Sequence, residues 1–189
     1  MREPIVKLIM SQSATLYLIS NDRFELLEDN PDKTKIQSLS YGNETFEQTY
    51  EGLSFLLEKF FEREDLTLIK EIFEPTEFIG EGLDDDLYES HTVDDIEKFE
   101  ESAIYYLDPI QISRINVLLT SLDISTVLNA YNPGEFNNNG VYPEVWHDDE
   151  SEGQAFNKTH LHWSLESLIH FFKAAASSSD DYVLVSIRY

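Results

Sequence analysis

The segment from residue 164 to the end of the chain limits the fold more than any other part of the sequence. Four of its apolar residues recur at i, i+3, i+4 and i+7, namely Leu165, Leu168, Ile169 and Phe172. This spacing predicts a helix that starts near Ser164 and buries one face. Residues 182–187, Tyr-Val-Leu-Val-Ser-Ile, run almost without a polar break, as a strand covered on both faces requires. We therefore expect a buried C-terminal strand with this helix packed on it.

The rest of the chain predicts further strands and helices. β-branched and aromatic residues indicate strands over residues 13–19 and 103–107. Asp108 and Pro109 open a helix in the favoured way, as an N-cap followed by proline at the first helical position. Apolar periodicity predicts helices over residues 22–30, 46–61, 66–73, 109–122 and 124–131.

Two local features qualify this pattern. Gly52 lies inside the helix predicted over residues 46–61, where glycine costs about 1 kcal/mol relative to alanine. Either a neighbouring segment approaches closely at Gly52, or the helix is locally weak. Further along, residues 137–140 predict a polar loop, and this loop leads into a short extended segment over residues 141–146.

Together these elements predict an α/β (or α+β) fold. We expect a single three-layer domain with a mixed sheet, helices on both faces of the sheet and the C-terminal strand buried inside it. A length of 189 residues suits one domain, and no repeat or linker divides the chain, so the domain is expected to span residues 1–189. An acidic loop insertion is expected around residues 81–101, where ten acidic residues stand against the single base Lys98.

The charge of the chain bears on its partners. Asp and Glu number 37 against 13 Lys and Arg, which gives a formal net charge of -24. Such a surface repels phosphate backbones and anionic lipids, so we expect neither nucleic-acid nor membrane binding. A basic protein is the kind of partner that this charge permits. Since the chain has no cysteine and no apolar segment of bilayer length, we expect a cytoplasmic protein; its oligomeric state is not predicted.

No catalytic residue is predicted, because no catalytic motif is present. The sequence has no Gly-x-Ser-x-Gly elbow, no dinucleotide fingerprint and no cysteine to serve as a nucleophile. No cofactor is expected, apart from a divalent metal in one alternative. On an extended backbone, His160 and His162 would share one face and could join a carboxylate in a metal site. The candidate ligands are His147, Asp148, Asp149, His160 and His162. The opposing interpretation places these residues on a loop and at the amino end of a helix.

Tyr142 and Trp146 form a second candidate site. Their Tyr-Pro-x-x-Trp segment stands beside four acidic residues. It could form the wall of a ligand pocket, since ligands bind in concave apolar sites with a few polar groups. The alternative is that the two aromatic rings cover the hydrophobic core.

Several short motifs resemble the YfbM-like family, which comprises small bacterial proteins of unknown function. They are Tyr-Leu-Asp-Pro at 106–109, Val-Tyr-Pro-Glu-Val-Trp at 141–146, Glu-Gly-Gln at 152–154, Leu-Glu-Ser-Leu-Ile-His-Phe-Phe at 165–172, the closing Val-Leu-Val-Ser-Ile strand and the segment 50–57. The first residues of the chain and the acidic stretch around Asp84 depart from the family pattern. The resemblance implies a compact domain with a sheet and helices on both faces. It implies no catalytic residue, because none is established for the family.

Two functions from different classes are consistent with these observations. The first is a non-enzymatic binding module that acts, like an immunity protein, through its acidic surface on a basic protein partner. The alternative is a small metal-assisted hydrolase or metal-binding protein that uses the His and Asp cluster at 147–162. The absence of a catalytic motif favours the binding module over an enzyme.

Overall fold

The structure, a computed structural model, describes residues 12–80 and 103–188. Within these residues five strands form one open sheet in the order β2-β1-β5-β4-β3. The strands are β1 (Ser13–Ile19), β2 (Gly42–Glu47), β3 (Phe78–Ile79), β4 (Ile104–Leu107) and β5 (Tyr182–Arg188). The α-helices are α1 (Asn21–Asp29), α2 (Ile36–Leu39), α3 (Tyr50–Leu57), α4 (Arg63–Lys70), α7 (Pro109–Ser121), α8 (Ile124–Asn129), α9 (Pro133–Asn138) and α10 (Lys158–Ala175). Two 3-10 turns are η1 (Lys33–Lys35) and η2 (Glu58–Phe60).

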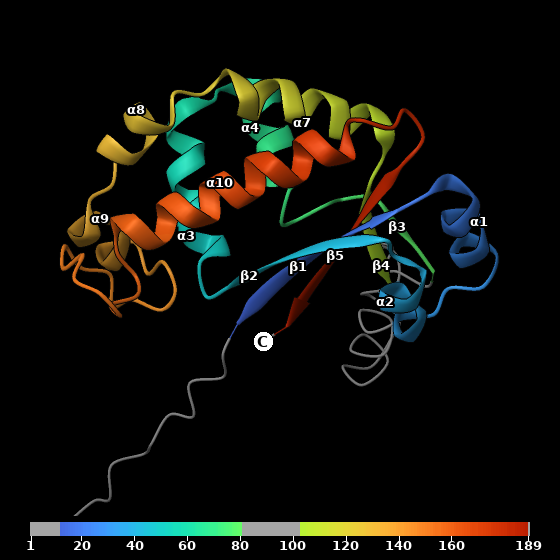
Figure 1. Cartoon of the computed structure of the whole chain (residues 1–189), viewed down its shortest axis with the longest axis horizontal. Helices are drawn as coiled ribbons and strands as arrows, with labels where there is room; N and C mark the ends of the chain where they lie inside the picture. Colours follow the sequence, from blue (N-terminus) through green and yellow to red (C-terminus); the bar gives the residue numbers. More distant parts are fainter. Residues whose placement is uncertain (1–11, 81–102, 189) are drawn as a thin grey trace, which may run out of the picture.

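Helices cover both faces of the sheet. Figure 1 shows α10 crossing above the sheet together with α3, α4 and α7, whereas α1 and α2 lie at its other side. The larger core joins the first helix layer to sheet residues such as Leu16 and Val183. The smaller core joins Phe24 and Leu27 of α1 to Leu184 of β5. The expected three-layer fold with helices on both faces is therefore confirmed.

The C-terminal strand occupies the centre of the sheet. β5 pairs with β1 over residues 182–188 and with β4 over Val183–Val185. Val183 and Val185 enter the larger core and Leu184 enters the smaller one, because successive side chains of a strand point to opposite faces. This arrangement confirms that the closing strand is buried.

The sheet is antiparallel rather than mixed. All of its described strand pairs run antiparallel, so the expectation of a mixed sheet was wrong in this respect. A parallel pair usually arises from one crossover helix between two strands. Here four helices, α7 to α10, separate β4 from β5, and they return the chain to the end of the sheet where β4 stops, because Leu107 pairs with Val183.

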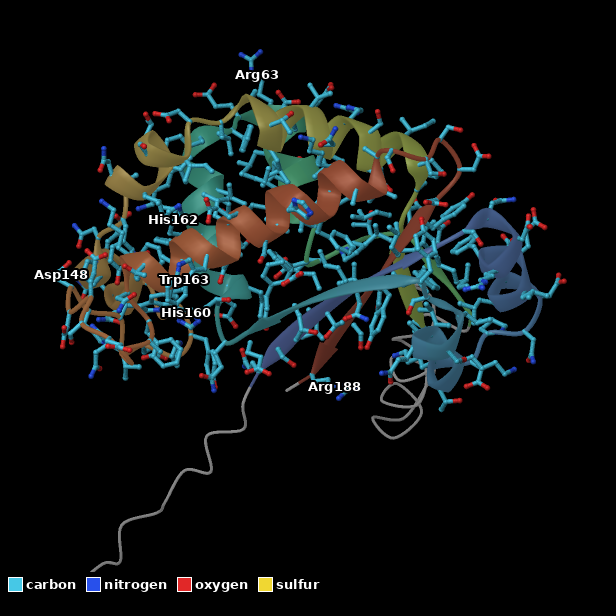
Figure 2. All side chains as sticks on the ribbon, in the orientation of Figure 1. Arg63, Asp148, His160, His162, Trp163 and Arg188 are labelled. Atoms are coloured by element: carbon cyan, nitrogen blue, oxygen red, sulfur yellow. The ribbon has the colours of Figure 1, made fainter. Side chains whose placement is uncertain are left out.

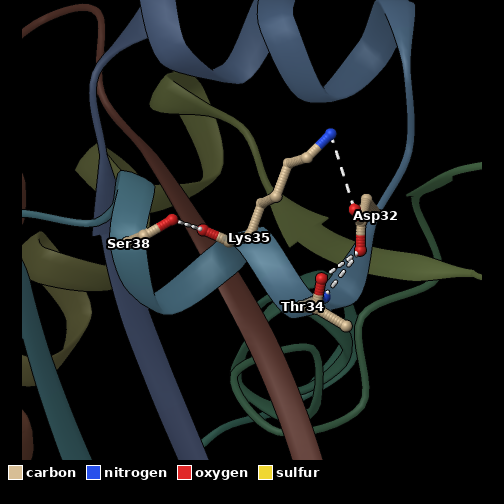
Figure 3. A network of polar contacts seen from close by, with 4 residues as sticks. All are labelled: Asp32, Thr34, Lys35 and Ser38. Carbon is tan, nitrogen blue, oxygen red and sulfur yellow. Dashed lines mark hydrogen bonds and ion pairs between the residues drawn. The ribbon is translucent and has the colours of Figure 1, made fainter.

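Side-chain caps fix where several helices and turns begin. Asp108 caps α7 with a reciprocal capping box, since its Oδ1 accepts from the Gln111 amide at 2.7 Å while Gln111 Oε1 accepts from the Asp108 amide at 2.8 Å. Figure 3 shows the related cap of η1, where Asp32 Oδ1 accepts from the Thr34 amide at 3.0 Å and Lys35 Nζ lies 3.4 Å from Asp32 Oδ2. The helix predicted from Asp108 and Pro109 is confirmed.

Several predicted boundaries were wrong. Phe46 belongs to β2, where it faces Ala14 of β1, and the following helix begins only at Tyr50. The spacing from Phe46 to Tyr50 imitates a helix, but the chain turns between them at Gln48, whose φ is 58°. Residues 137–138, expected in a polar loop, end helix α9.

Residues 141–146 are not an extended segment. They form a turn that contains a cis Tyr142-Pro143 bond and a positive φ of 62° at Glu144. The acidic insertion expected around residues 81–101 lies outside the described residues. Among the described helices, none is both long and apolar enough to cross a bilayer.

Gly52 resolves the alternatives that the sequence left open. A Cβ atom at this position would lie 2.5 Å from Cη2 of Trp146 and 3.2 Å from Cδ2 of Leu161. The first contact is far inside van der Waals range and is to a rigid indole ring, and the second is tighter than most Cβ contacts. A neighbouring segment therefore approaches α3 closely at Gly52, and any larger residue would displace it.

We expect Gly52→Ala to destabilise the protein although alanine favours helix formation. Overpacking a core costs about 1–3 kcal/mol, which exceeds the gain of up to about 1 kcal/mol in helix propensity. Urea unfolding measures the change, and Trp146→Phe supplies the matched background because phenylalanine lacks the atoms that clash. The two changes should be non-additive, with the cost of Gly52→Ala reduced in the Phe background. A stabilising effect of Gly52→Ala alone would contradict this packing.

Candidate functional site

The clearest concentration of exposed charge in the described chain is a loop at one end of the molecule. We call residues 144–152 the acidic loop; its exposed acidic residues are Glu144, Asp148, Asp149, Glu150 and Glu152. No Lys or Arg occurs between Arg114 and Lys158, so the chain on either side of the loop supplies no compensating cation. Figure 2 places Asp148 at the end of the molecule where α10 begins.

Trp146 anchors the first half of the acidic loop in the core. Its side chain is 3% exposed and packs edge-on against Phe136 at a ring distance of 5.1 Å. The indole Nε1 donates to the Val141 carbonyl at 3.0 Å. Asn137 of α9 accepts from the Trp146 amide and donates to the Trp146 carbonyl, both at 2.9 Å. These contacts fix the backbone at Trp146, from which Glu144 and Asp148 are only two residues away.

Asn157 anchors the second half of the loop. This residue is 1% exposed, and its Nδ2 donates to the Asp149 carbonyl at 2.7 Å. Its Oδ1 accepts from the His160 amide at 2.9 Å and so caps α10. Tyr131 adds a third tie by donating its hydroxyl proton to the His147 carbonyl at 2.9 Å. The acidic side chains therefore project from a backbone that the fold holds in place.

Hydrogen bonding and burial shift the pKa values of two groups at the loop. Hydrogen bonds from the Ser151 hydroxyl and amide, at 2.6 and 3.0 Å, lower the pKa of Asp149, because they stabilise its charged form. Burial and then the negative charge of Asp148 raise the pKa of Tyr131 to about 12. Asp149 is therefore anionic and Tyr131 neutral at physiological pH.

The proposed metal ligands do not come together. His160 and His162 both lie on helix α10, where side chains two residues apart diverge, so the extended backbone that a shared site required is absent. His162 Nε2 lies 3.4 Å from Glu166 on the same helix, and His147 Nδ1 accepts from the Asp149 amide at 3.2 Å. Within residues 12–80 and 103–188 no group of three His, Asp or Glu side chains is arranged to hold a metal ion. The reason is that helix α10 begins at Lys158 instead of near Ser164, so both histidines are helical and do not share one face.

His160 has a structural role that depends on pH. Its Nδ1 accepts from the Phe156 amide at 3.1 Å, which requires a neutral ring, and burial lowers its pKa from the ordinary value of 6.5. A lowered pKa stabilises the fold fully above the unfolded value, and this contribution is lost as the pH falls from 6.5 through the folded pKa.

We expect the unfolding free energy to fall between about pH 7.5 and about pH 5.5, and by less in His160→Gln than in the natural protein. The difference should be about 1 kcal/mol or less, the contribution of one hydrogen bond. Chemical unfolding of both proteins at the two pH values measures it. His170→Gln, on an exposed position of the same helix, is the matched control. An identical pH dependence in His160→Gln and the natural protein would refute this role.

Trp146 is a core residue in the described structure. Its burial leaves no ring face for a ligand, while the Tyr142 amide donates to Glu51 Oε2 at 3.0 Å. A separate cavity of about 430 Å³ lies beside β4 and β5, and its lining includes neither Tyr142 nor Trp146. Of the two interpretations of this segment, the geometry favours the one in which the aromatic rings cover the hydrophobic core rather than form the wall of a ligand pocket.

Two asparagines that organise the loop were missed in the sequence. Asn137 looked like part of a polar loop, and nothing local shows that its side chain grips Trp146. Asn157 carried a usable signal, because an Asn followed by an apolar stripe is a helix start. Leu161 and Leu165 continue the stripe of Leu168 and Phe172 back toward Asn157, which would have placed the start of α10 correctly.

Comparisons with known proteins define the family of this chain. Residues 10–185 match the model of the family described as domain of unknown function DUF1877, and the chain belongs to that family. The fold is similar to the crystal structure of YfbM from Escherichia coli, a protein of unknown function, with a TM-score of 0.61 and 17% sequence identity. The match covers 95% of this chain and 100% of YfbM. No curated protein matches. The resemblance to the YfbM-like family is thus confirmed, and at this identity it extends to the fold alone.

Proposed function

We propose that this chain is a non-enzymatic binding module that acts through its acidic surface on a basic protein partner, as an immunity protein does on a cationic toxin. The observation that carries the proposal is the acidic loop, whose five exposed carboxylates lie in a chain segment without Lys or Arg. Among the described residues of a chain of net charge -24, this loop is the densest run of exposed carboxylates, and a basic partner would gain favourable charge interactions there.

The anchoring of the loop supports a binding role. A flexible acidic segment would lose conformational entropy when it bound, whereas a segment already held in place loses less. Asn137, Asn157 and Tyr131 hold the loop backbone at Trp146, Asp149 and His147. Complementary charge would mainly raise the association rate and select against acidic partners, and a pre-organised loop would retain the partner once it has arrived.

The test is a pull-down from the source cell at low and at high salt with the natural protein and two matched variants. The loop variant carries Glu144→Gln, Asp148→Asn and Glu152→Gln. The control variant removes the same number of charges from α1 through Asp22→Asn, Glu28→Gln and Asp29→Asn. All six side chains are exposed.

We expect basic proteins to be enriched at low salt by the natural protein and by the α1 variant, and to be lost with the loop variant and at high salt. Enrichment that is equal in the loop and α1 variants would show that the loop is not the binding surface. If the natural protein enriches no basic protein at low salt, the proposed function is wrong.

A further inference from the structure

Strand β2 forms an open edge of the sheet. Its partner β1 lies on one side, and no described strand lies on the other. The Gln48 amide donates to the Gln12 carbonyl at 2.9 Å, which sets the alternation of the antiparallel ladder. It follows that the main-chain groups of Asn43, Thr45 and Glu47 point away from β1. These outward groups are the ones to which an added strand would bind.

A groove runs between this edge and helix α10. Its volume is about 530 Å³, and its lining includes Glu44 of β2 and Glu166, Ile169 and Lys173 of α10. Ser164 of the same helix donates to the Thr49 hydroxyl at 3.1 Å, so α10 is held over the end of β2. Figure 1 shows α10 crossing above β2. The groove gives the side chains of an added strand a place on one face of the sheet.

The charges beside the edge select the occupant. Glu44 faces the α10 side, as does its buried neighbour Phe46, whereas Glu47 lies on the opposite face with Thr45, which pairs with Thr15. A strand added here would meet a carboxylate on either face. Lys173 is the one Lys or Arg among the described residues that line the groove, whereas Glu44 and Glu166 supply two carboxylates.

A second copy of the chain does not fit this edge. Edge strands of natural proteins often avoid pairing with each other through lysine, proline or bulges. The sequence of β2, Gly-Asn-Glu-Thr-Phe-Glu, contains neither lysine nor proline. Its two glutamates would repel those of another β2, because like charges close together across a strand pair are destabilising.

We propose that β2 binds an extended basic segment of the protein partner by strand addition. This inference rests on the proposed function and names the surface and binding mode. Main-chain hydrogen bonds with Asn43, Thr45 and Glu47 hold the segment, and its lysines or arginines meet Glu44 and Glu166 on one face or Glu47 on the other. The Glu47 end of β2 leads into α3, where Glu51 accepts from the Tyr142 amide just before the acidic loop and Gly52 lies against Trp146 within the loop. These contacts tie the backbone that follows β2 to the backbone of the loop.

The test uses an octapeptide of alternating lysine and valine, with affinity measured by fluorescence anisotropy at low salt. Thr45→Pro removes an outward donor without removing a bond to β1, and Thr45→Val is its control because it loses only the hydroxyl contact with Thr15. Two further peptides are N-methylated at every second residue, one in each register, so that each blocks the donors on one edge of the peptide strand. Thermal unfolding checks that Thr45→Pro retains the fold.

We expect Thr45→Pro to weaken binding at least about tenfold, the size of effect that one or two lost hydrogen bonds produce, and Thr45→Val to leave it nearly unchanged. One methylated peptide should bind and the other should not. Amide hydrogen exchange should slow at Asn43, Thr45 and Glu47 when the natural protein is bound; this last measurement needs no variant.

Strand addition is wrong if both methylated peptides bind as well as the parent peptide, or if the amides of Asn43, Thr45 and Glu47 are not protected. If the parent peptide still binds the natural protein but not the loop variant, the proposed function survives, with the acidic loop as the binding surface in place of β2. An octapeptide in which glutamate replaces lysine should not bind. If neither the lysine and valine peptide nor any basic protein from the pull-down binds at low salt, the proposed function is wrong as well.

Discussion

A chain that ends at Asp181 is expected not to fold, because it lacks the central strand of the sheet. Removing β5 leaves β1 and β4 without their shared partner and uncovers both hydrophobic cores at Val183, Leu184 and Val185. Burying such side chains contributes roughly 1.5–3 kcal/mol each, against a total stability of about 5–15 kcal/mol for a typical domain. Thermal unfolding followed by circular dichroism should show no cooperative transition.

A matched pair of substitutions refines this test within the full chain. Leu184→Asn places an amide where the side chain is 0% exposed, whereas Ser186→Asn changes a partly exposed residue on the same face of β5. Only the first should lower the melting temperature strongly. If the chain ending at Asp181 unfolds cooperatively within a few degrees of the full-length protein, β5 is not central to stability.

The second large effect is expected from Trp146→Ala, at about 3–5 kcal/mol of lost stability, as for other large aromatic residues deleted from a core. The substitution removes the ring that packs against Phe136 and Phe156 and the hydrogen bond from Nε1 to the Val141 carbonyl. Urea unfolding measures the loss. Limited proteolysis should also cleave the acidic loop faster, since its first anchor is gone.

Trp163→Ala is the control, because Trp163 is the other tryptophan of the chain and its side chain is 63% exposed. Figure 2 labels it on α10. A surface substitution of this kind should change stability by no more than about 0.5 kcal/mol. Equal effects of the two substitutions would contradict the placement of Trp146 in the core.

Much of the fold could be predicted because the decisive segments are locally unambiguous. Leu165, Leu168 and Phe172 could form a buried stripe only on a helix, and Tyr182 to Ile187 required cover on both faces. The cap at Asp108 depended only on neighbours in the sequence. In each case the pattern and the tertiary environment agree, so local reasoning was sufficient.

The errors arose where tertiary contacts decide the structure. Phe46 fits a helical spacing with Tyr50 equally well, but its pairing with Ala14 across the sheet places it in β2. The antiparallel direction of the sheet depends on how four successive helices return the chain, which no local pattern records. Likewise, Gly52 is explained only by the indole of Trp146, which lies 94 positions further along the chain.

The sequence predicted the negative charge of the candidate site but not the contacts that hold its backbone in place. Asp148 and Asp149 were singled out as metal ligands, whereas the described structure shows them as exposed members of an anchored acidic loop. The two histidines failed as a pair because α10 extends back to Lys158. Asn157 could have been read as the cap of α10, but the bonds by which Asn137 and Asn157 hold the loop backbone, nine and eight positions away, leave no mark in composition or spacing.

The central claim, that the acidic surface acts on basic chains, is tested most directly by association kinetics. The measurement is the association rate constant of the alternating lysine and valine octapeptide with the natural protein and the loop variant, at about 0.01 M and about 0.15 M salt, between which the Debye length falls from about 30 Å to about 8 Å. We predict fast association at low salt, a steep fall with added salt, and slower association for the loop variant at low salt with a smaller change in dissociation rate. An association rate that is independent of salt, and equal in the natural protein and the loop variant, would contradict the account.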